Sequence, residues 1–174
     1  MKTKLIYPVL MLATIISIIS YISISSKGDR TERLELEIML DKLAYRSNSP
    51  IPIYIKLKNT GETKVLVNGR MAVNYFNAPT ALRDITFVLI GPDGEPVSFK
   101  AAVNIRPPRE EDIVILLPQK TIERIDDIQT LYDMHKIGSY TIYAIYQNTF
   151  EADRNPSTWK GEITSNSIGF EITQ

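Results

Sequence analysis

The feature that most constrains this chain is a period of two in the placement of its apolar residues. Between residues 34 and 41, and again between residues 51 and 58, every second residue is apolar and most of the others are polar or charged. Successive side chains of a β-strand point to opposite faces, so this alternation is typical of a strand with one buried face. The body of the chain is therefore expected to consist of strands.

Further strands are expected at residues 64–68, 85–90, 96–102, 113–117, 121–128, 139–147 and 162–173. Turn-forming residues separate them, most clearly at Asn59-Thr60-Gly61-Glu62 and at Gly91-Pro92-Asp93-Gly94-Glu95. The one helical turn expected in the body covers residues 127–133. Short strands with regular turns and without crossover helices predict an all-β fold, an antiparallel β-sandwich.

The segment Gly138-Ser139-Tyr140-Thr141-Ile142 refines this prediction. It places a tyrosine at the start of the penultimate strand, where immunoglobulin-like sandwiches carry a tyrosine whose hydroxyl bonds to upstream backbone. We therefore expect an immunoglobulin-like antiparallel β-sandwich of about seven to nine strands. In it, Gly138 and Tyr140 have structural roles.

The N-terminal segment predicts a hydrophobic helix before the sandwich. Residues 5–24 are apolar or uncharged, Lys2 and Lys4 precede them, and charged residues follow from Lys27. A helix of this length spans about 30 Å, the thickness of a bilayer's hydrocarbon core. Lysines before the run favour a C-terminal domain outside the cytoplasm.

Two interpretations of this segment stay open. Residues 1–26 are either a signal-anchor that holds the chain in the cell membrane as a single-pass protein, or a signal peptide cleaved near Ser25, which would give a secreted protein. On both interpretations residues 27–33 are a polar linker and residues 34–174 are the exported domain.

Charge and composition exclude several classes of function. All 20 acidic residues but only 17 of the 20 basic ones lie in residues 28–174, which therefore carry a net charge of −3. Without a cluster of basic residues, such a domain is not expected to bind nucleic acid. The chain has no cysteine, which excludes disulfides and thiolate chemistry. The lack of an N-glycosylation sequon, Asn-x-Ser/Thr with x other than proline, fits a prokaryotic source.

Candidate chemistry is sparse. His135 is the only histidine, and Asp133 lies two residues before it in a connection. A metal site usually needs more such ligands, and nucleophilic catalysis needs a partner that the sequence does not supply. The carboxylate clusters at residues 110–112 and 126–127 fit charged loops. We therefore expect no catalytic residue, no metal, no cofactor and no enzyme activity.

Two long loops are the candidate binding regions. In the immunoglobulin-like strand order, residues 69–84 and 148–161 lie at the same end of the sandwich, and long loops in compact domains are often functional. They carry side chains of the types that anchor interfaces: Arg70, Tyr75, Phe76, Phe150, Arg154 and Trp159. The alternative is that the aromatic side chains fold down and close the end of the sandwich.

A set of short segments resembles a known family. The order Leu117-Pro118-Gln119-Lys120-Thr121, Ile125-Asp126, Leu131-Tyr132-Asp133, Gly138-Ser139-Tyr140-Thr141-Ile142 and Tyr146 is similar to that of a non-catalytic domain. This domain is the immunoglobulin-like β-sandwich that accompanies secreted deuterolysin-like zinc metallopeptidases. The His-Glu-x-x-His motif of the peptidase domain is absent here, so the resemblance implies an accessory domain without catalytic residues. A looser resemblance, through residues 50–57 and Asn59-Thr60-Gly61, is to bacterial proteinase-inhibitor-like sandwiches.

These observations favour a non-enzymatic, extracytoplasmic binding or interaction module with a protein or cell-envelope partner. A first alternative is an inhibitor or accessory regulator of a secreted hydrolase such as a protease, working through residues 105–112, which Pro107-Pro108 stiffens. A second alternative is a structural envelope protein that associates with itself.

Overall fold

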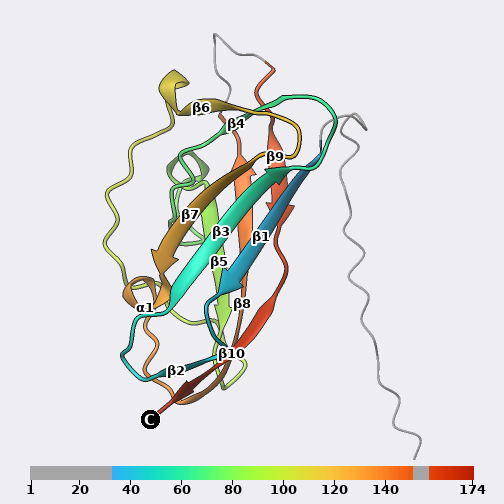
Figure 1. Ribbon diagram of the computed structural model, residues 1–174. Helices are drawn as coiled ribbons and strands as arrows, with labels where there is room; N and C mark the ends of the chain where they lie inside the picture. The colour runs from blue at the N-terminus through green and yellow to red at the C-terminus, as the bar shows by residue number, and fades with distance from the viewer. Residues whose placement is uncertain (1–32, 151–156) are drawn as a thin grey trace, which may run out of the picture.

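The computed structural model describes residues 33–150 and 157–174, which form an all-β structure (Figure 1). The strands are β1 (Leu34–Leu40), β2 (Ala44–Arg46), β3 (Pro52–Asn59), β4 (Val65–Asn68), β5 (Ile85–Ile90), β6 (Ile113–Leu116), β7 (Thr121–Asp127), β8 (Gly138–Asn148), β9 (Gly161–Thr164) and β10 (Ile168–Thr173). The helical elements are short: η1 (Thr80–Leu82), η2 (Glu110–Asp112) and α1 (Ile128–Leu131).

One face of the molecule is the front sheet, in which β3 pairs antiparallel with β1 on one side and with β7 on the other (Figure 1). Alternate residues of β1 and β3 point inward, so that Ile38 and its cross-strand partner Ile55 are both completely buried. Burying one such side chain stabilises the fold by about 1.5–3 kcal/mol. The alternation in the sequence thus predicts these two strands correctly.

The other layer is the back sheet, with the order β2-β10-β8-β5. The long strand β8 pairs with β5 along one edge and with β10 and then β9 along the other, all antiparallel. The short strand β2 runs parallel to β10. A separate two-stranded antiparallel sheet, formed by β4 and β6, lies at one end of the molecule (Figure 1).

The hydrophobic core lies between the two sheets. Side chains of both layers contribute to one continuous cluster, whose fully buried members include Ile38, Ile53, Ile55, Leu57, Ile85, Leu89, Ile142 and Tyr146. Two sheets that bury one face each against the other form a β-sandwich. The all-β sandwich expected from the sequence is therefore what the described residues form.

Tyr140 lies near the start of β8, and its side chain is held from two sides. Its hydroxyl donates a hydrogen bond to the carbonyl of Lys136, four residues upstream, over 2.7 Å. Its ring stacks on Phe170 of β10 with 5.6 Å between centroids. Gly138 has a φ of +131°, and a Cβ there would lie 3.0 Å from the Pro92 side chain, so a larger residue would be strained.

Residues 96–102 differ from the prediction, because they form no strand. Single bridges connect Pro96 to Ile90 and Phe99 to Tyr132, but no ladder continues between them. Proline lacks the N–H that a ladder requires, and after Val97 donates to Leu89 the chain leaves the sheet edge. Val97 and Phe99 still pack against the core, which explains why the sequence alternates here.

The predicted last strand, residues 162–173, is divided into β9 and β10 by the segment 165–167. This break places the Asn166 side chain on the front sheet, where its amide accepts from the N–H of Ile38 at 2.9 Å and donates to the carbonyl of Ile38 at 3.1 Å. One side chain therefore occupies the free edge of β1 as a short strand would.

The helical turn expected at residues 127–133 is present as α1. The Asp127 carboxylate accepts from the N–H groups of Gln129 and Ile51, so that it caps α1 and holds the start of β3. In the described ranges, no helix is long and apolar enough to cross a membrane. The predicted membrane segment, residues 5–24, lies outside those ranges.

We predict that Tyr140→Phe lowers the free energy of unfolding by about 1 kcal/mol, the net contribution of one hydrogen bond. The ring and its stacking on Phe170 are retained, so that the substitution removes the bond to Lys136 alone. Urea unfolding of the full-length chain, followed by the fluorescence of the single tryptophan, measures the change. Tyr143→Phe is the control, because the hydroxyl of Tyr143 has no hydrogen-bond partner among the described residues. Equal loss in both variants would contradict the assignment.

Candidate functional site

The loop at residues 69–84 is fixed by one buried carboxylate, that of Asp84, which is 2% exposed. Its oxygens accept from Nε and Nη2 of Arg70, both at 2.7 Å, and from Nδ2 of Asn68 at 2.9 Å. They also accept from the N–H of Ala72 at 2.8 Å. Taking a charge out of water costs several kcal/mol unless it is paired and hydrogen-bonded, and here these contacts supply that pairing.

Arg70 also contacts the segment before β6, residues 105–112. The Arg70 guanidinium donates to the carbonyl of Arg106. In turn, Arg106 donates from both terminal nitrogens to the carboxylate of Asp112, at 2.6 and 2.8 Å. Bidentate pairs of this kind combine charge with a fixed geometry. The hydrogen bond from Arg106 holds the pKa of Asp112 below its usual range, so Asp112 is charged at neutral pH.

A third pair lies on β7, where Arg124 donates to Asp126 at 2.5 and 2.9 Å. The Arg124 guanidinium interacts electrostatically with Asp84, as Arg106 does. Three Arg–Asp pairs therefore lie near one another, one in the loop at residues 69–84, one in residues 105–112 and one on β7. In each pair the two charges neutralise each other. Of the three, the Arg70–Asp84 pair holds the loop at residues 69–84, because both of its residues belong to that loop.

This clamped loop presents two aromatic side chains to solvent. Tyr75 is 44% exposed and Phe76 is 56% exposed, whereas Ala72, Val73 and Asn74 just before them are buried. The backbone N–H of Asn74 donates to the carbonyl of Ile85, so the loop also runs beside the start of β5. The exposed pair is thus carried on backbone that is tied to the sheet.

Neighbouring side chains complete a small surface around this pair. The Tyr75 ring lies 6.0 Å from that of Phe99, and Phe99 contacts Tyr132 edge-to-face at 5.3 Å. The guanidinium of Arg83 lies 5.1 Å from the centre of the Phe76 ring and donates to the Phe76 carbonyl. We name the surface formed by Tyr75, Phe76, Arg83 and Phe99 the Tyr75 patch. Its two exposed rings do not close the end of the sandwich.

The other predicted binding residues have different surroundings. The Arg70 side chain is only 12% exposed and is engaged by Asp84, so it positions the loop. Trp159 stacks on buried Tyr146 with 5.7 Å between ring centroids, which fits the interpretation that this ring folds down, and its backbone N–H donates to the carbonyl of Leu66 at 2.7 Å. Phe150 is half-buried, and Arg154 lies outside the described residues.

Arg83 and Phe99 were not identified as site residues from the sequence. Phe99 fell within an expected strand, where the alternation indicated a core residue. Arg83 directly precedes Asp84 and has no motif around it. Only the folded loop brings these two side chains beside Tyr75 and Phe76.

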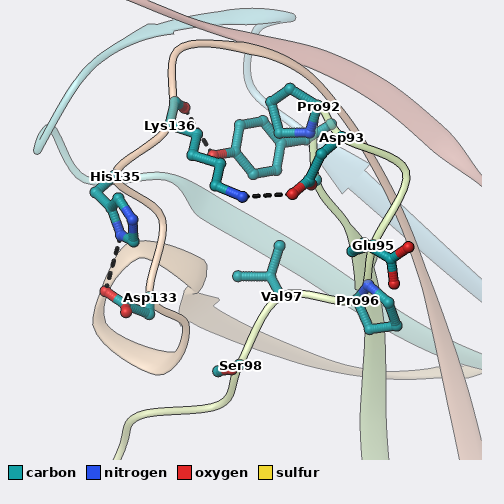
Figure 2. Close-up of a pocket in the computed structure, with 11 residues that line it drawn as sticks. Pro92, Asp93, Glu95, Pro96, Val97, Ser98, Asp133, His135 and Lys136 are labelled. Carbon is teal, nitrogen blue, oxygen red and sulfur yellow. Dashed lines mark hydrogen bonds and ion pairs between the residues drawn. The ribbon is translucent and has the colours of Figure 1, made fainter.

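A second candidate is a hollow of about 150 Å³ at the opposite end of β5 (Figure 2). Its rim carries an ion pair between Lys136 and Asp93, and the Nδ1 atom of His135 lies 3.3 Å from the carboxylate of Asp133. The hydrogen bond from Lys136 lowers the pKa of Asp93. Figure 2 shows Ser98 on a separate segment, away from the His135 ring.

This hollow has little chemical capacity. Small-molecule sites usually enclose about 300–1,000 Å³, and catalysis by a histidine requires a nucleophile within its reach. His135 and Asp133 are solvent-exposed, with side-chain exposures of 67% and 58%, as expected of loop residues. Within the described ranges, no group of three or more His, Cys, Asp or Glu residues could hold a metal ion.

Comparison with models of known protein families finds no match. Comparison with curated proteins finds none either. Among solved structures, the chain is similar to a β-glucosidase from Erythrobacter marinus at 9% identity and a TM-score of 0.35. The likeness covers 82% of this chain but only 16% of the β-glucosidase. At this TM-score it supports no inference about activity.

We predict that Asp84→Ala lowers the free energy of unfolding by about 3–5 kcal/mol, because it leaves the Arg70 charge buried without its partner. The double variant Asp84→Ala/Arg70→Met removes both charges and is expected to recover part of this loss. Urea unfolding of the full-length chain measures both. Asp93→Ala is the control, since its exposed pair with Lys136 contributes little. A single substitution at Asp84 as mild as the control would show that the buried pair does not hold the fold.

Proposed function

We propose that this chain is a non-enzymatic, extracytoplasmic binding module that uses the Tyr75 patch to bind a protein of the cell envelope. The observation that carries the proposal is the combination of two exposed aromatic rings with a loop clamped by a buried ion pair. The ion pair fixes the loop while the two rings remain in solvent.

The chemistry of the patch suits a protein partner. Aromatic and arginine side chains contribute most to binding at protein interfaces. Tyr75 and Phe76 supply apolar surface, and Arg83, held over the Phe76 ring, adds a positive charge beside them. Because the loop is already ordered, binding costs little conformational entropy.

We infer that the sandwich is of the immunoglobulin-like type. Its strand order supports this: β1-β3-β7 in one sheet, β5-β8-β10 in the other, and β2 parallel to β10. The bond from the Tyr140 hydroxyl to the Lys136 carbonyl is of the kind that this fold carries at the start of its penultimate strand. An accessory role like that of the domain beside deuterolysin-like peptidases agrees with this type.

The alternative of a protease inhibitor has less support. An inhibitory loop would present extended backbone to a protease, and residues 105–112 were the candidate. Here Asp112 accepts from the side chain of Arg106 and from the N–H of Arg109 at 2.7 Å, which curls the segment back on itself. A binding module therefore accounts better for the geometry.

We predict that a photo-reactive phenylalanine analogue at position 76 cross-links the full-length chain to a protein partner in intact cells. The reason is that Phe76 is the most exposed residue of the Tyr75 patch, at 56%. Tyr75→Ala in the same chain is expected to abolish the adduct, because it removes the neighbouring ring. Gel shifts and mass spectrometry detect and identify the adduct.

The matched control carries the analogue at position 125, since Ile125 on β7 is 60% exposed and lies on the outer face of the front sheet. An adduct at position 76 and not at 125 supports the patch. The same adduct at both positions, or none at 76, would reject it.

The location of the protein is a separate part of the proposal. Residues 5–24 with Lys2 and Lys4 favour insertion with the C-terminal domain outside. We predict that the intact mass of the membrane-associated protein includes residues 1–26, as a signal-anchor requires. A mass that begins near Ser25, with the protein in the medium, would show cleavage and secretion. Protein found inside the cytoplasm would overturn the proposed location.

A further inference from the structure

Among the residues that the structure describes, strand β6 has one edge without a partner strand. It pairs with β4 through its other edge, and Gly69 N–H donates to Asp112 at the start of this ladder. Hydrogen-bonded pairs alternate along antiparallel strands, so residues 112 and 114 bond toward β4, whereas the carbonyl of Ile113 and both backbone groups of Ile115 point away. The N–H of Ile113 donates to the carbonyl of Glu110 in η2. The backbone groups of Leu66, which lies opposite Ile115, likewise point away from β6. The Leu66 carbonyl accepts from the backbone N–H of Trp159 at 2.7 Å.

Three other strand edges, those of β1, β7 and β5, are protected. Asn166 occupies the edge of β1, and β7 carries the inward-facing charges of Arg124 and Asp126. The edge of β5 is bridged by Val73 and by Pro96. Proteins protect edges in these ways because an open edge can pair with another chain.

In contrast, β6 has no charge, no proline and no bulge. Its sequence is Ile-Val-Ile-Leu, followed by Leu117. Val114 is 37%, Ile115 58% and Leu117 51% exposed. Figure 1 shows β6 at the upper end of the molecule, next to β4. An apolar, uncovered edge of this kind is a site for strand addition.

We propose that β6 pairs antiparallel with β6 of a second copy of this chain, around a two-fold axis at Ile115. Such pairing is self-complementary, because each strand offers the same outward backbone groups and the same apolar run to the other. In this arrangement Leu66, Ile115 and Ile115 of the second copy are cross-strand neighbours in turn. Residues 158–159, β4 and β6 of each copy thereby become one sheet.

The charges that flank β6 favour this arrangement over others. Residues 106–112, which precede the strand, hold two arginines that pair with Glu111 and Asp112 and three acidic residues, so that they carry a net charge of −1, and Lys120 follows the strand. Antiparallel pairing places the acidic end of each copy near Lys120 of the other, whereas parallel pairing would place like charges together. The charges at the two ends of β6 are thus complementary to those of a second copy of the same strand. The interface is short, so the association is expected to be weak and to depend on concentration.

The test is the association of the full-length chain with itself, measured by analytical ultracentrifugation over a wide range of concentration. Ile115→Lys places like charges opposite each other at the axis and is expected to weaken dimerisation at least tenfold. Ile125→Lys is the control, because Ile125 is equally exposed but lies on β7. The control retains the apolar N-terminal segment, so association through that segment would persist in both variants.

A second measurement separates pairing at Ile115 from a general effect of charge. Ile115→Glu alone is also expected to weaken the dimer, but a mixture of Ile115→Lys and Ile115→Glu chains should associate as mixed dimers. Dimers in the wild type and in the mixture, and loss in each single variant, support the proposal. A wild type that is monomeric at all concentrations, or a mixture that stays monomeric, would overturn it. So would a cross-linker at position 115 that captures a different protein.

The proposal does not depend on the Tyr75 patch. Ile115→Lys leaves Tyr75, Phe76, Arg83 and Phe99 unchanged, so cross-linking at position 76 can be measured in the same variant. Failure of one proposal is therefore distinguishable from failure of the other.

Discussion

The buried carboxylate of Asp84 is the interaction on which the arrangement of the loops depends. It stands one residue before β5, and its side chain holds Asn68 at the end of β4, Arg70 and the backbone at Ala72. Its own backbone carbonyl accepts from Gln147 of β8 at 2.8 Å. Asp84 thus connects β4 and β8 to the loop at residues 69–84. Because a lone buried charge is costly, these contacts are satisfied together or not at all.

This constraint explains why the exposed aromatic rings and the buried charges occur together. A loop of sixteen residues, 69–84, would lose much conformational entropy if it were ordered only by surface contacts. The Arg70–Asp84 pair fixes the two ends of the loop, and the contact of Tyr75 with Phe99 fixes its middle against residues 96–102. The rings of Tyr75 and Phe76 therefore keep one position while remaining in solvent. Rigid, exposed aromatic groups are what a preformed interface requires.

The sequence predicted those parts of the fold whose signal is local. Alternation located β1, β3, β5 and β8, and turn residues located the connections. It failed at residues 96–102, because Val97 and Phe99 are half-buried by packing on the core without belonging to a ladder. The sequence also could not show that Arg70 is buried in an ion pair whereas Tyr75 is exposed. The partner of Arg70 lies fourteen residues away, and a buried pair has no local pattern. Trp159 and Tyr75 look alike in sequence, yet one stacks on Tyr146 and the other faces water.

The contrast between β6 and the other edges follows from the same physical rule. Where an edge adjoins the core, polar groups protect it: Asn166 bonds to Ile38, and Arg124 pairs with Asp126. Lysine or glutamate in place of Ile115, which points away from the core, would protect β6 in the same way at little cost in packing. An isoleucine that is 58% exposed on an unprotected edge is therefore more easily understood if the edge has a partner. The run of three acidic residues on one side and Pro118 and Lys120 on the other limits that pairing to a short segment. Such limits favour a defined dimer over open-ended assembly.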